Sequence, residues 1–231
     1  MIQMLRTVIG YLRAVTKLAF GKGVCRSYGH QGEDAVLQAT LKWVKNGTYV
    51  DVGAYHPVLY SNTYAFYKKG WNGIVIDPNS DMQKLYGLMR PRDVFVHSAV
   101  GQTVEEKTYY MFADGAYNSF DETRARSWKE TRGLEVKETR TISFKPLAQI
   151  LKEQNITKID FLNIDVEGLD FEVLKTHDWS VETRVIAIED ETFNAGKPGE
   201  NEIYTYLHAK GYALIGLVGL TLLFEKPKQA T

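Results

Sequence analysis

The pattern of apolar and polar positions divides most of the chain into short apolar runs and longer amphipathic stretches. Apolar runs of strand length cover 48–52, 73–77, 93–100, 159–164 and 184–188. Helices are expected between them, over 33–45, 61–70, 81–88, 146–154, 169–176 and 202–210. Two final apolar runs, 212–219 and 220–226, are joined by a short turn, which predicts an antiparallel hairpin.

This alternation predicts an α/β fold in which repeated strand–helix units build a Rossmann-like, doubly wound and mostly parallel sheet. The C-terminal hairpin brings the expected number of strands to seven. Ligands of such sheets bind at the carboxyl ends of the strands. The residues that directly follow each apolar run are therefore the first candidates for a functional site.

Residues 102–145 interrupt the alternation. Two strand-like stretches, 106–113 and 134–144, flank the polar segment 114–133, which we interpret as an insertion or a lid over the acceptor. No repeat, low-complexity tract or linker marks a second domain. We expect one domain over 27–231, preceded by an extension over 1–26.

The extension predicts an amphipathic helix. Its apolar residues recur at helical spacing, and its basic residues meet no acid before Glu33. Such a helix suits the surface of an anionic membrane, which residues 1–22 would contact peripherally. It suits equally well a contact with the domain or with a second subunit in a homo-oligomer, and the sequence leaves these alternatives open.

Composition narrows the function classes. Lys plus Arg and Asp plus Glu both number 28, so the formal net charge is zero, which argues against a nucleic-acid partner. A single cysteine, Cys25, fits a reducing cytoplasm. Arg6, Arg13 and Lys17 interrupt the apolar stretches at the start, so neither a signal peptide nor a spanning segment is expected. We expect a cytoplasmic protein, with the inner face of the membrane as the alternative.

Two acids stand at neighbouring strand tips. Asp51 precedes the turn at Gly53, where the backbone can approach a ligand closely, and Asp77 ends the next strand, where a carboxylate can hold ribose hydroxyls. The turn lacks the three glycines that seat a pyrophosphate, which disfavours a nicotinamide-dependent oxidoreductase. The alternative is that both acids only cap turns or helices.

Five motifs carry a family resemblance: "SYGHQGEDAVL", "YVDVGAYHP", "GWNGIVIDPN", "HSAVG" and "FLNIDVEGLDFEVLK". Their order and spacing, from about Ser27 to Glu189, resemble the FkbM family of S-adenosylmethionine-dependent methyltransferases, whose fold is of the class I type. The "IDVEG" block is the most specific of them. Many relatives carry Asn and Gly where this chain has Tyr55 and Pro57.

The resemblance implies a cofactor, S-adenosylmethionine, and a role for each matching residue. Asp51 and Gly53, with Ala54, would line its methionine half, and Asp77 would bind its ribose. Ser98 and Ala99 would lie beside the adenine of the cofactor. Tyr28 and Gln31 would cover its methionine end. His56 and Asn62 would supply further polar contacts in the loop.

The resemblance also implies an activity, methyl transfer to a hydroxyl oxygen. The acceptor would be a sugar in the biosynthesis of a glycan, a lipopolysaccharide, a glycolipid or a secondary metabolite. Two alternatives are a non-catalytic, cofactor-binding scaffold of a glycan-assembly complex and, less favoured, the oxidoreductase. A DNA or amino-group methyltransferase would usually show an NPPY-like loop where this chain reads "NIDVEG".

A hydroxyl acceptor needs a base or a metal ion to stabilise its alkoxide. Asp165, at the tip of the fourth strand, is the first candidate; Glu167 fits an active-site role and a helix-start role equally. His56 is the alternative base, since its ordinary pKa lies near neutrality. Asp170 is expected on the solvated surface.

Further acids and aromatic residues surround these candidates. Glu189 and Asp190 follow the fifth strand and, with Asp165, would offer oxygen ligands to Mg²⁺, an ion that the sequence permits but does not establish. Packing is expected for the aromatic side chains of the strand-like stretch 106–113, whereas those between Tyr117 and Trp128 are open to stacking on a sugar ring.

Overall fold

The computed structural model describes residues 2–19, 25–166 and 168–227. Its main sheet has seven strands in the order β3-β2-β1-β7-β8-β10-β9, all parallel except β10, which runs antiparallel to both neighbours. This topology confirms the predicted fold class and the terminal hairpin. The strands are β1 (Thr48–Val52), β2 (Asn72–Asp77), β3 (Val94–His97), β7 (Lys158–Ile164), β8 (Glu182–Glu189), β9 (Ala213–Val218) and β10 (Thr221–Glu225).

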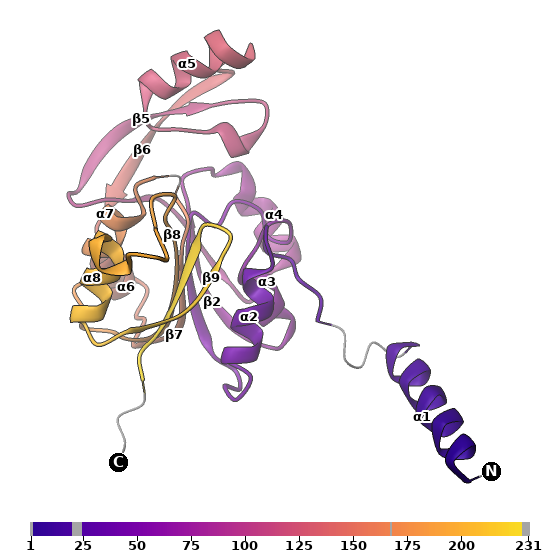
Figure 1. Cartoon of the computed structure of the whole chain (residues 1–231). Coiled ribbons are helices and arrows are strands. Elements are labelled where there is room, and N and C mark those ends of the chain that lie inside the picture. Colours follow the sequence, from indigo (N-terminus) through magenta and orange to yellow (C-terminus); the bar gives the residue numbers. More distant parts are fainter. Residues whose placement is uncertain (1, 20–24, 167, 228–231) are drawn as a thin grey trace.

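Helices cover both faces of the sheet (Figure 1). One face carries α2 (Glu33–Thr40), α3 (Tyr64–Lys68) and α4 (Asp81–Met89), and the other carries α6 (Leu147–Glu153), α7 (Asp170–Lys175) and α8 (Glu202–Ala209). Alternate residues of each strand supply the two cores: Val50 and Val52 pack with α6 to α8, whereas Tyr49 packs with α2 to α4. The expected helix over 33–45 ends early, because the chain turns at Leu41 to place Gly47 against the Trp71 ring.

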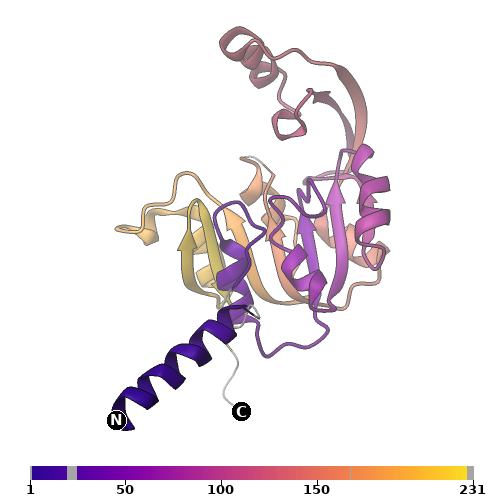
Figure 2. The same cartoon turned by 90° about the vertical axis from the view of Figure 1, so that its right-hand side faces the viewer.

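A second sheet rises from the chain after β3. It comprises β4 (Ala99–Val100), β5 (Glu105–Met111) and β6 (Glu138–Lys145) in the order β4-β6-β5. The expectation of one strand over 93–100 is wrong, because the chain changes sheets at Ser98, whose hydroxyl donates to the backbone oxygens of Ala99 and Ser143. We call residues 102–145 the arm; it stands over the carboxyl ends of the main strands (Figures 1 and 2).

The tip of the arm contains a helix that the sequence analysis did not predict. A 3₁₀ turn, η1 (Gly115–Tyr117), precedes α5 (Glu122–Arg132). The Asp121 carboxylate accepts the backbone N–H groups of Thr123 and Arg124 at the start of α5, and Gly133 ends it with a φ of 67°. Because α5 is polar almost all round, its capping residues were the stronger signal.

The expected N-terminal helix is present as α1 (Ile2–Ala19). Its apolar side chains meet solvent; Met4 is 76% exposed and Leu12 55%. Figure 1 shows α1 standing away from the sheet. Among the described helices, none is long and apolar enough to cross a membrane.

One buried cation joins the elements beneath the strand ends. The Arg90 side chain, at the end of α4, is fully buried, and its Nε donates to the equally buried Asp93 carboxylate at 2.6 Å. Its two terminal nitrogens donate to the hydroxyls of Tyr49, Ser61 and Thr63 at 2.9–3.2 Å. A buried charge is tolerated only when it is paired and hydrogen-bonded in this way.

We predict that Arg90→Met lowers the free energy of unfolding by about 3–5 kcal/mol, because it leaves the Asp93 carboxylate buried without its cation. Urea denaturation followed by circular dichroism measures this. The matched control is Arg126→Met: the Arg126 side chain is 75% exposed, so the change should cost less than about 1 kcal/mol. Equal losses for both variants would contradict the structural role of Arg90.

Candidate active site

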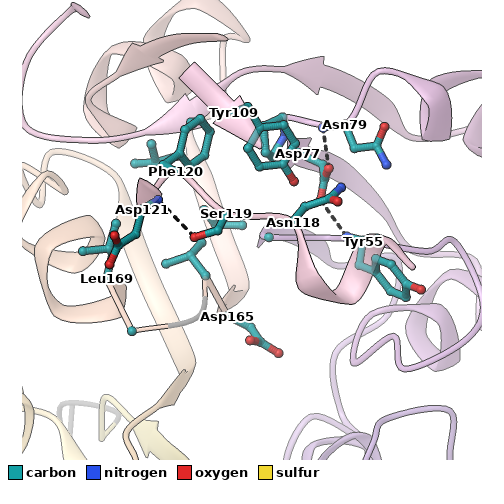
Figure 3. Close-up of a pocket in the computed structure, with 18 of the residues that line it drawn as sticks. Tyr55, Asp77, Asn79, Tyr109, Asn118, Ser119, Phe120, Asp121, Asp165 and Leu169 are labelled. Carbon is teal, nitrogen blue, oxygen red and sulfur yellow. Dashed lines mark hydrogen bonds between the residues drawn. The ribbon is translucent and has the colours of Figure 1, made fainter. Parts of the chain in front are cut away.

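A cavity of about 870 Å³ lies between the carboxyl ends of the main strands and the arm. Gly53, Asp77 and Asp165 contribute to it from the tips of β1, β2 and β7. Tyr109, Asn118 and Phe120 of the arm face them across the cavity (Figure 3). The site predicted at the strand ends is therefore enclosed on its far side by residues 102–145.

Gly53 holds two loops of the site together. Its φ is 80°, and a Cβ at this position would overlap the backbone oxygen of Asp165. The backbone N–H of Asp165 also donates to the oxygen of Val52. Only glycine permits this approach, so the turn after β1 and the turn after β7 are fixed to each other.

Asp77 lies on the cavity wall, with its carboxylate held by backbone donors. Tyr55 N and Asn79 N donate to its two oxygens at 2.8 and 2.7 Å. Burial raises the pKa of Asp77 from 3.8 to about 7, because these two hydrogen bonds offset only part of the desolvation. A ligand whose hydroxyl groups donate hydrogen bonds to this carboxylate would stabilise its charged form.

Asp51 lies beneath the cavity rather than on its wall. Thr63 Oγ1 donates to one of its oxygens at 2.5 Å and Asn163 Nδ2 to the other at 2.9 Å. Burial raises its pKa, and these donors together with Arg90 oppose that shift. The acid expected to contact the methionine half therefore organises the polar residues below the ligand.

The other residues expected to bind the cofactor divide into two groups. Ala99 lines the cavity, whereas Ala54 and Ser98 are buried beside it. Tyr28 and Gln31 stand in the loop before α2 without lining the cavity; the Tyr28 hydroxyl accepts a hydrogen bond from Lys68, and Gln31 N donates to Glu33. Glu33, which the sequence analysis did not select, does line it.

Among the candidate bases, Asp165 lines the cavity. His56 does not: its Nδ1 accepts the backbone N–H groups of Val58 and Leu59, and burial lowers its pKa. The neutral ring thus uses its acceptor nitrogen within its own loop. Glu167 lies outside the described residues.

The expectation that Asp170 is solvated is wrong. It is 4% exposed, and its carboxylate accepts the backbone N–H groups of Val166 and Gly168, both at 3.0 Å. Burial raises its pKa to about 7. Asp170 folds the loop that carries Asp165, a role that its helical position in the sequence did not indicate.

Glu189 and Asp190, the remaining metal candidates, stand at the tip of β8 and do not line the cavity. The Asp190 carboxylate accepts hydrogen bonds from Thr192 and Asn201. Within the described ranges, no three His, Cys, Asp or Glu side chains converge as a metal site would require.

The aromatic residues of the arm fall into two groups, one that lines the cavity and one that packs within the arm. Tyr109 and Phe120 line the cavity, with ring centroids 4.6 Å apart. Tyr117 and Phe112 instead pack edge-on against Trp128 and so attach α5 to the rest of the arm. Tyr109, a strand residue expected to pack, thus also lines the cavity, whereas Tyr117 and Trp128, which were left open to an acceptor, pack on each other.

Two buried side-chain atoms in the described part of the chain have no hydrogen-bond partner: Asn62 Oδ1 and Asn118 Nδ2. Both side chains line the cavity. A buried polar group without a partner costs about 1–3 kcal/mol, so a ligand that offers a donor to Asn62 and an acceptor to Asn118 would be favoured in this cavity.

The sheet order, the cavity over the strand ends and the buried acid at the tip of β2 give the chain the Rossmann-like architecture that was expected of a class I methyltransferase. The family model for the FkbM methyltransferase domain matches residues 51–214. The chain therefore belongs to the FkbM methyltransferase family, which confirms the resemblance seen in its motifs. S-adenosylmethionine, the expected cofactor, is accordingly its methyl donor.

Two further comparisons add little. None of the curated proteins matches the chain significantly. Among solved structures, one similar chain is the Burkholderia thailandensis 1,6-didemethyltoxoflavin-N1-methyltransferase with bound 1,6-didemethyltoxoflavin and S-adenosylhomocysteine. It is 13% identical, the match covers 96% of this chain and 90% of that one, and the TM-score is 0.44, a likeness that supports no argument about substrate.

The cavity fits the methyl donor. S-adenosylmethionine carries an ammonium group that can donate to Asn62 Oδ1, ribose hydroxyls that can donate to Asp77, and adenosine atoms that can accept from Asn118. The unpaired acceptor and the unpaired donor of the cavity are thus complementary in kind to a donor and an acceptor of the cofactor.

We predict that the stability of the ligand-free protein relative to Asp77→Asn falls as the pH rises from about 4 to 7. Between the ordinary pKa of 3.8 and the folded value of about 7, the folded state keeps a proton that the unfolded chain has released. Raising the pH therefore removes stability, by up to about 1.4 kcal/mol per pH unit. The amide of the variant does not titrate.

Urea denaturation of both proteins at several pH values gives this difference. Asp178→Asn is the matched control, because Asp178 is exposed and hydrogen bonds from Ser180 lower its pKa. The difference in free energy of unfolding between Asp178→Asn and the wild type should not change between pH 5 and 8. A flat difference for Asp77→Asn as well would mean that Asp77 is charged throughout this range.

Proposed function

We propose that this protein is an O-methyltransferase that moves the methyl group of S-adenosylmethionine to a hydroxyl of a sugar. Its acceptor would belong to the biosynthesis of a glycan, a lipopolysaccharide, a glycolipid or a secondary metabolite. The observation that supports this most is one cavity lined by two carboxylates, Asp77 at the tip of β2 and Asp165 at the tip of β7 (Figure 3). Family membership supports the methyl donor.

The reaction is a displacement at carbon. S-adenosylmethionine, when bound, would supply an activated sulfonium methyl group; its transfer to the acceptor oxygen would break the carbon–sulfur bond and leave that electron pair on sulfur, as S-adenosylhomocysteine. What the protein must add is alignment, exclusion of water and a place for the hydroxyl proton.

Asp165 is proposed as the acceptor of that proton. It stands at the tip of β7, and its position is fixed by the contact with Gly53 and by the loop that Asp170 closes. A positioned carboxylate near the acceptor hydroxyl contributes typically ~10²–10⁴ in rate. No step of this mechanism passes through a metal ion.

The arm is proposed as the acceptor lid. Tyr109 and Phe120 turn aromatic surface toward the cavity, and Asp121 adds a polar group from the same segment (Figure 3). Sugars are bound in proteins by aromatic faces combined with carboxylates that accept hydroxyl hydrogen bonds. This combination supports a polyhydroxylated acceptor over a wholly apolar one.

We predict that Asp165→Asn lowers the rate of methyl transfer by about 10²–10⁴ while S-adenosylhomocysteine still binds. Methyl-labelled S-adenosylmethionine, offered with fractionated glycans and lipid-linked sugars, identifies the acceptor, and mass spectrometry locates the label. Calorimetry gives cofactor binding for the same variant. Asp178→Asn, on the surface, serves as the control with unchanged turnover.

Each outcome decides between the alternatives. Label in a methyl ether supports the proposal, whereas label on a nitrogen would replace the hydroxyl acceptor with an amine. Cofactor binding without transfer to any fraction would favour the non-catalytic scaffold. Unchanged turnover in Asp165→Asn would remove Asp165 from the mechanism and leave the activity standing.

We also propose that α1 holds the protein on an anionic membrane surface, near lipid-linked acceptors. Val8, Leu12 and Val15 form an exposed apolar stripe that no described part of the domain covers. Arg6 and Arg13 flank it, and no acid precedes Glu33. An apolar stripe with basic flanks is complementary to a headgroup layer of negative charge.

We predict that the full-length protein sediments with vesicles containing phosphatidylglycerol and that Leu12→Glu reduces this binding about tenfold or more. The reason is the lost burial of an apolar side chain in the headgroup region. Thr7→Glu makes the same change of charge beside the stripe, roughly a quarter turn round α1, and should have a smaller effect. Equal losses for both variants, or equal sedimentation with neutral vesicles, would contradict apolar insertion.

A further inference from the structure

The arm turns one face of its sheet toward the cavity. Arg140 of β6 is the register partner of Tyr109 of β5, and residues that lie opposite each other in an antiparallel pair place their side chains on the same face. Tyr109 and Phe144, both on this face, line the cavity. The Arg140 side chain, which is 24% exposed, therefore points to the same side as the residues that cover the cavity.

Two carboxylates hold the guanidinium group of Arg140. Within the arm, the Glu138 carboxylate accepts from Nε at 2.8 Å and from Nη2 at 2.9 Å. At the start of α4, the Asp81 carboxylate accepts from Nη1 at 3.0 Å and from Nη2 at 3.3 Å, and Ser80 Oγ accepts from Nη1 at 3.1 Å. Such paired contacts fix the direction of the side chain as well as its distance. Glu138 thus orients Arg140, and Asp81 ties it to the main domain.

Asp81 belongs to the turn that carries the acid of the cavity wall. Its backbone N–H donates to Asn79 Oδ1 at 3.1 Å, and Asn79 N donates to the Asp77 carboxylate at 2.7 Å. On the other side, Tyr55 N donates to Asp77, and a Cβ on Gly115 of the arm would lie 3.3 Å from the Tyr55 ring. The ring contact has no fixed direction, whereas the ion pair of Asp81 does.

We propose that Arg140 is the positioning residue of the arm. Its pair with Asp81 holds the cavity-facing side of β5 and β6 over the strand tips, and without this pair the arm moves away from them while both sheets stay folded. Partly exposed ion pairs contribute little to the stability of a fold, so the pair acts on position. The proposal deepens the proposed role of the arm as acceptor lid and rests on it.

Spin labels measure the position of the arm directly. In a Cys25→Ser background, Lys84→Cys on α4 and Glu130→Cys on α5 place labels at two exposed positions, and pulsed electron paramagnetic resonance gives the distance between them. The protein with Arg140 should give one narrow distribution, which Arg140→Met should broaden and shift to longer distances. Arg140→Lys keeps the charge without the planar fork, so it should restore part of the narrow distribution.

Calorimetry with S-adenosylhomocysteine is the second measurement. The arm and the strand tips line one cavity, so an arm that is in place for only part of the time lowers the apparent affinity by that fraction. Arg140→Met and Asp81→Asn should each raise the Kd by about 3- to 10-fold. The double variant should bind no more weakly than Arg140→Met alone, because both changes remove the same contact.

Arg126→Met is the matched control. Arg126 is also an arginine of the arm with an ion pair, but its partner, Glu122, lies within α5, so neither the distance nor the Kd should change. An unchanged distance distribution in Arg140→Met would overturn the proposal, as would equal broadening in Arg126→Met. A lower melting temperature of Arg140→Met with unchanged distance and Kd would also overturn it, because Arg140 would then act on stability alone.

These outcomes are separate from those of the proposed function. The labels report on the arm with no acceptor present, so a failure to methylate sugars would overturn the proposed acceptor and leave the distances as they are. Conversely, an arm that keeps its position in Arg140→Met would overturn the role of Arg140 and leave methyl transfer standing.

Discussion

The carboxylate of Asp51 is the constraint on which the site depends. It is buried at the middle of the sheet, next to Asn163 on β7, and the Arg90 cation reaches it through the hydroxyl of Thr63. Burying an acid in this way is unfavourable unless every oxygen has a donor. The donors come from β7 and from the start of α3, so a single charge sets the positions of residues that are far apart in the sequence.

Much of the fold could be predicted from the sequence because the strands are fully buried and the helices are amphipathic. Both patterns arise from the two apolar cores on either side of the sheet. The strand tips could be predicted too, since Asp77 ends an apolar run. Where the chain changes sheets, at Ser98, the apolar pattern continues without interruption, and periodicity alone cannot show the change.

The site was harder to predict because its residues act through one another. Asp51 and Asp77 look alike in sequence, yet one supports the cavity from below and the other forms its wall. Asn163 gave a signal that could have been used, a polar residue within a buried strand, and Asn62 a weaker one. Asp170 looked like a surface position because helical periodicity does not reveal that the preceding loop folds back onto it.

The position of the arm has a consequence for how the two sheets are held relative to each other. The cavity is lined both by the tips of the main strands and by residues of the arm. Any ligand that fills it therefore bridges the two sheets, and its binding free energy adds to the stability of this arrangement by mass action.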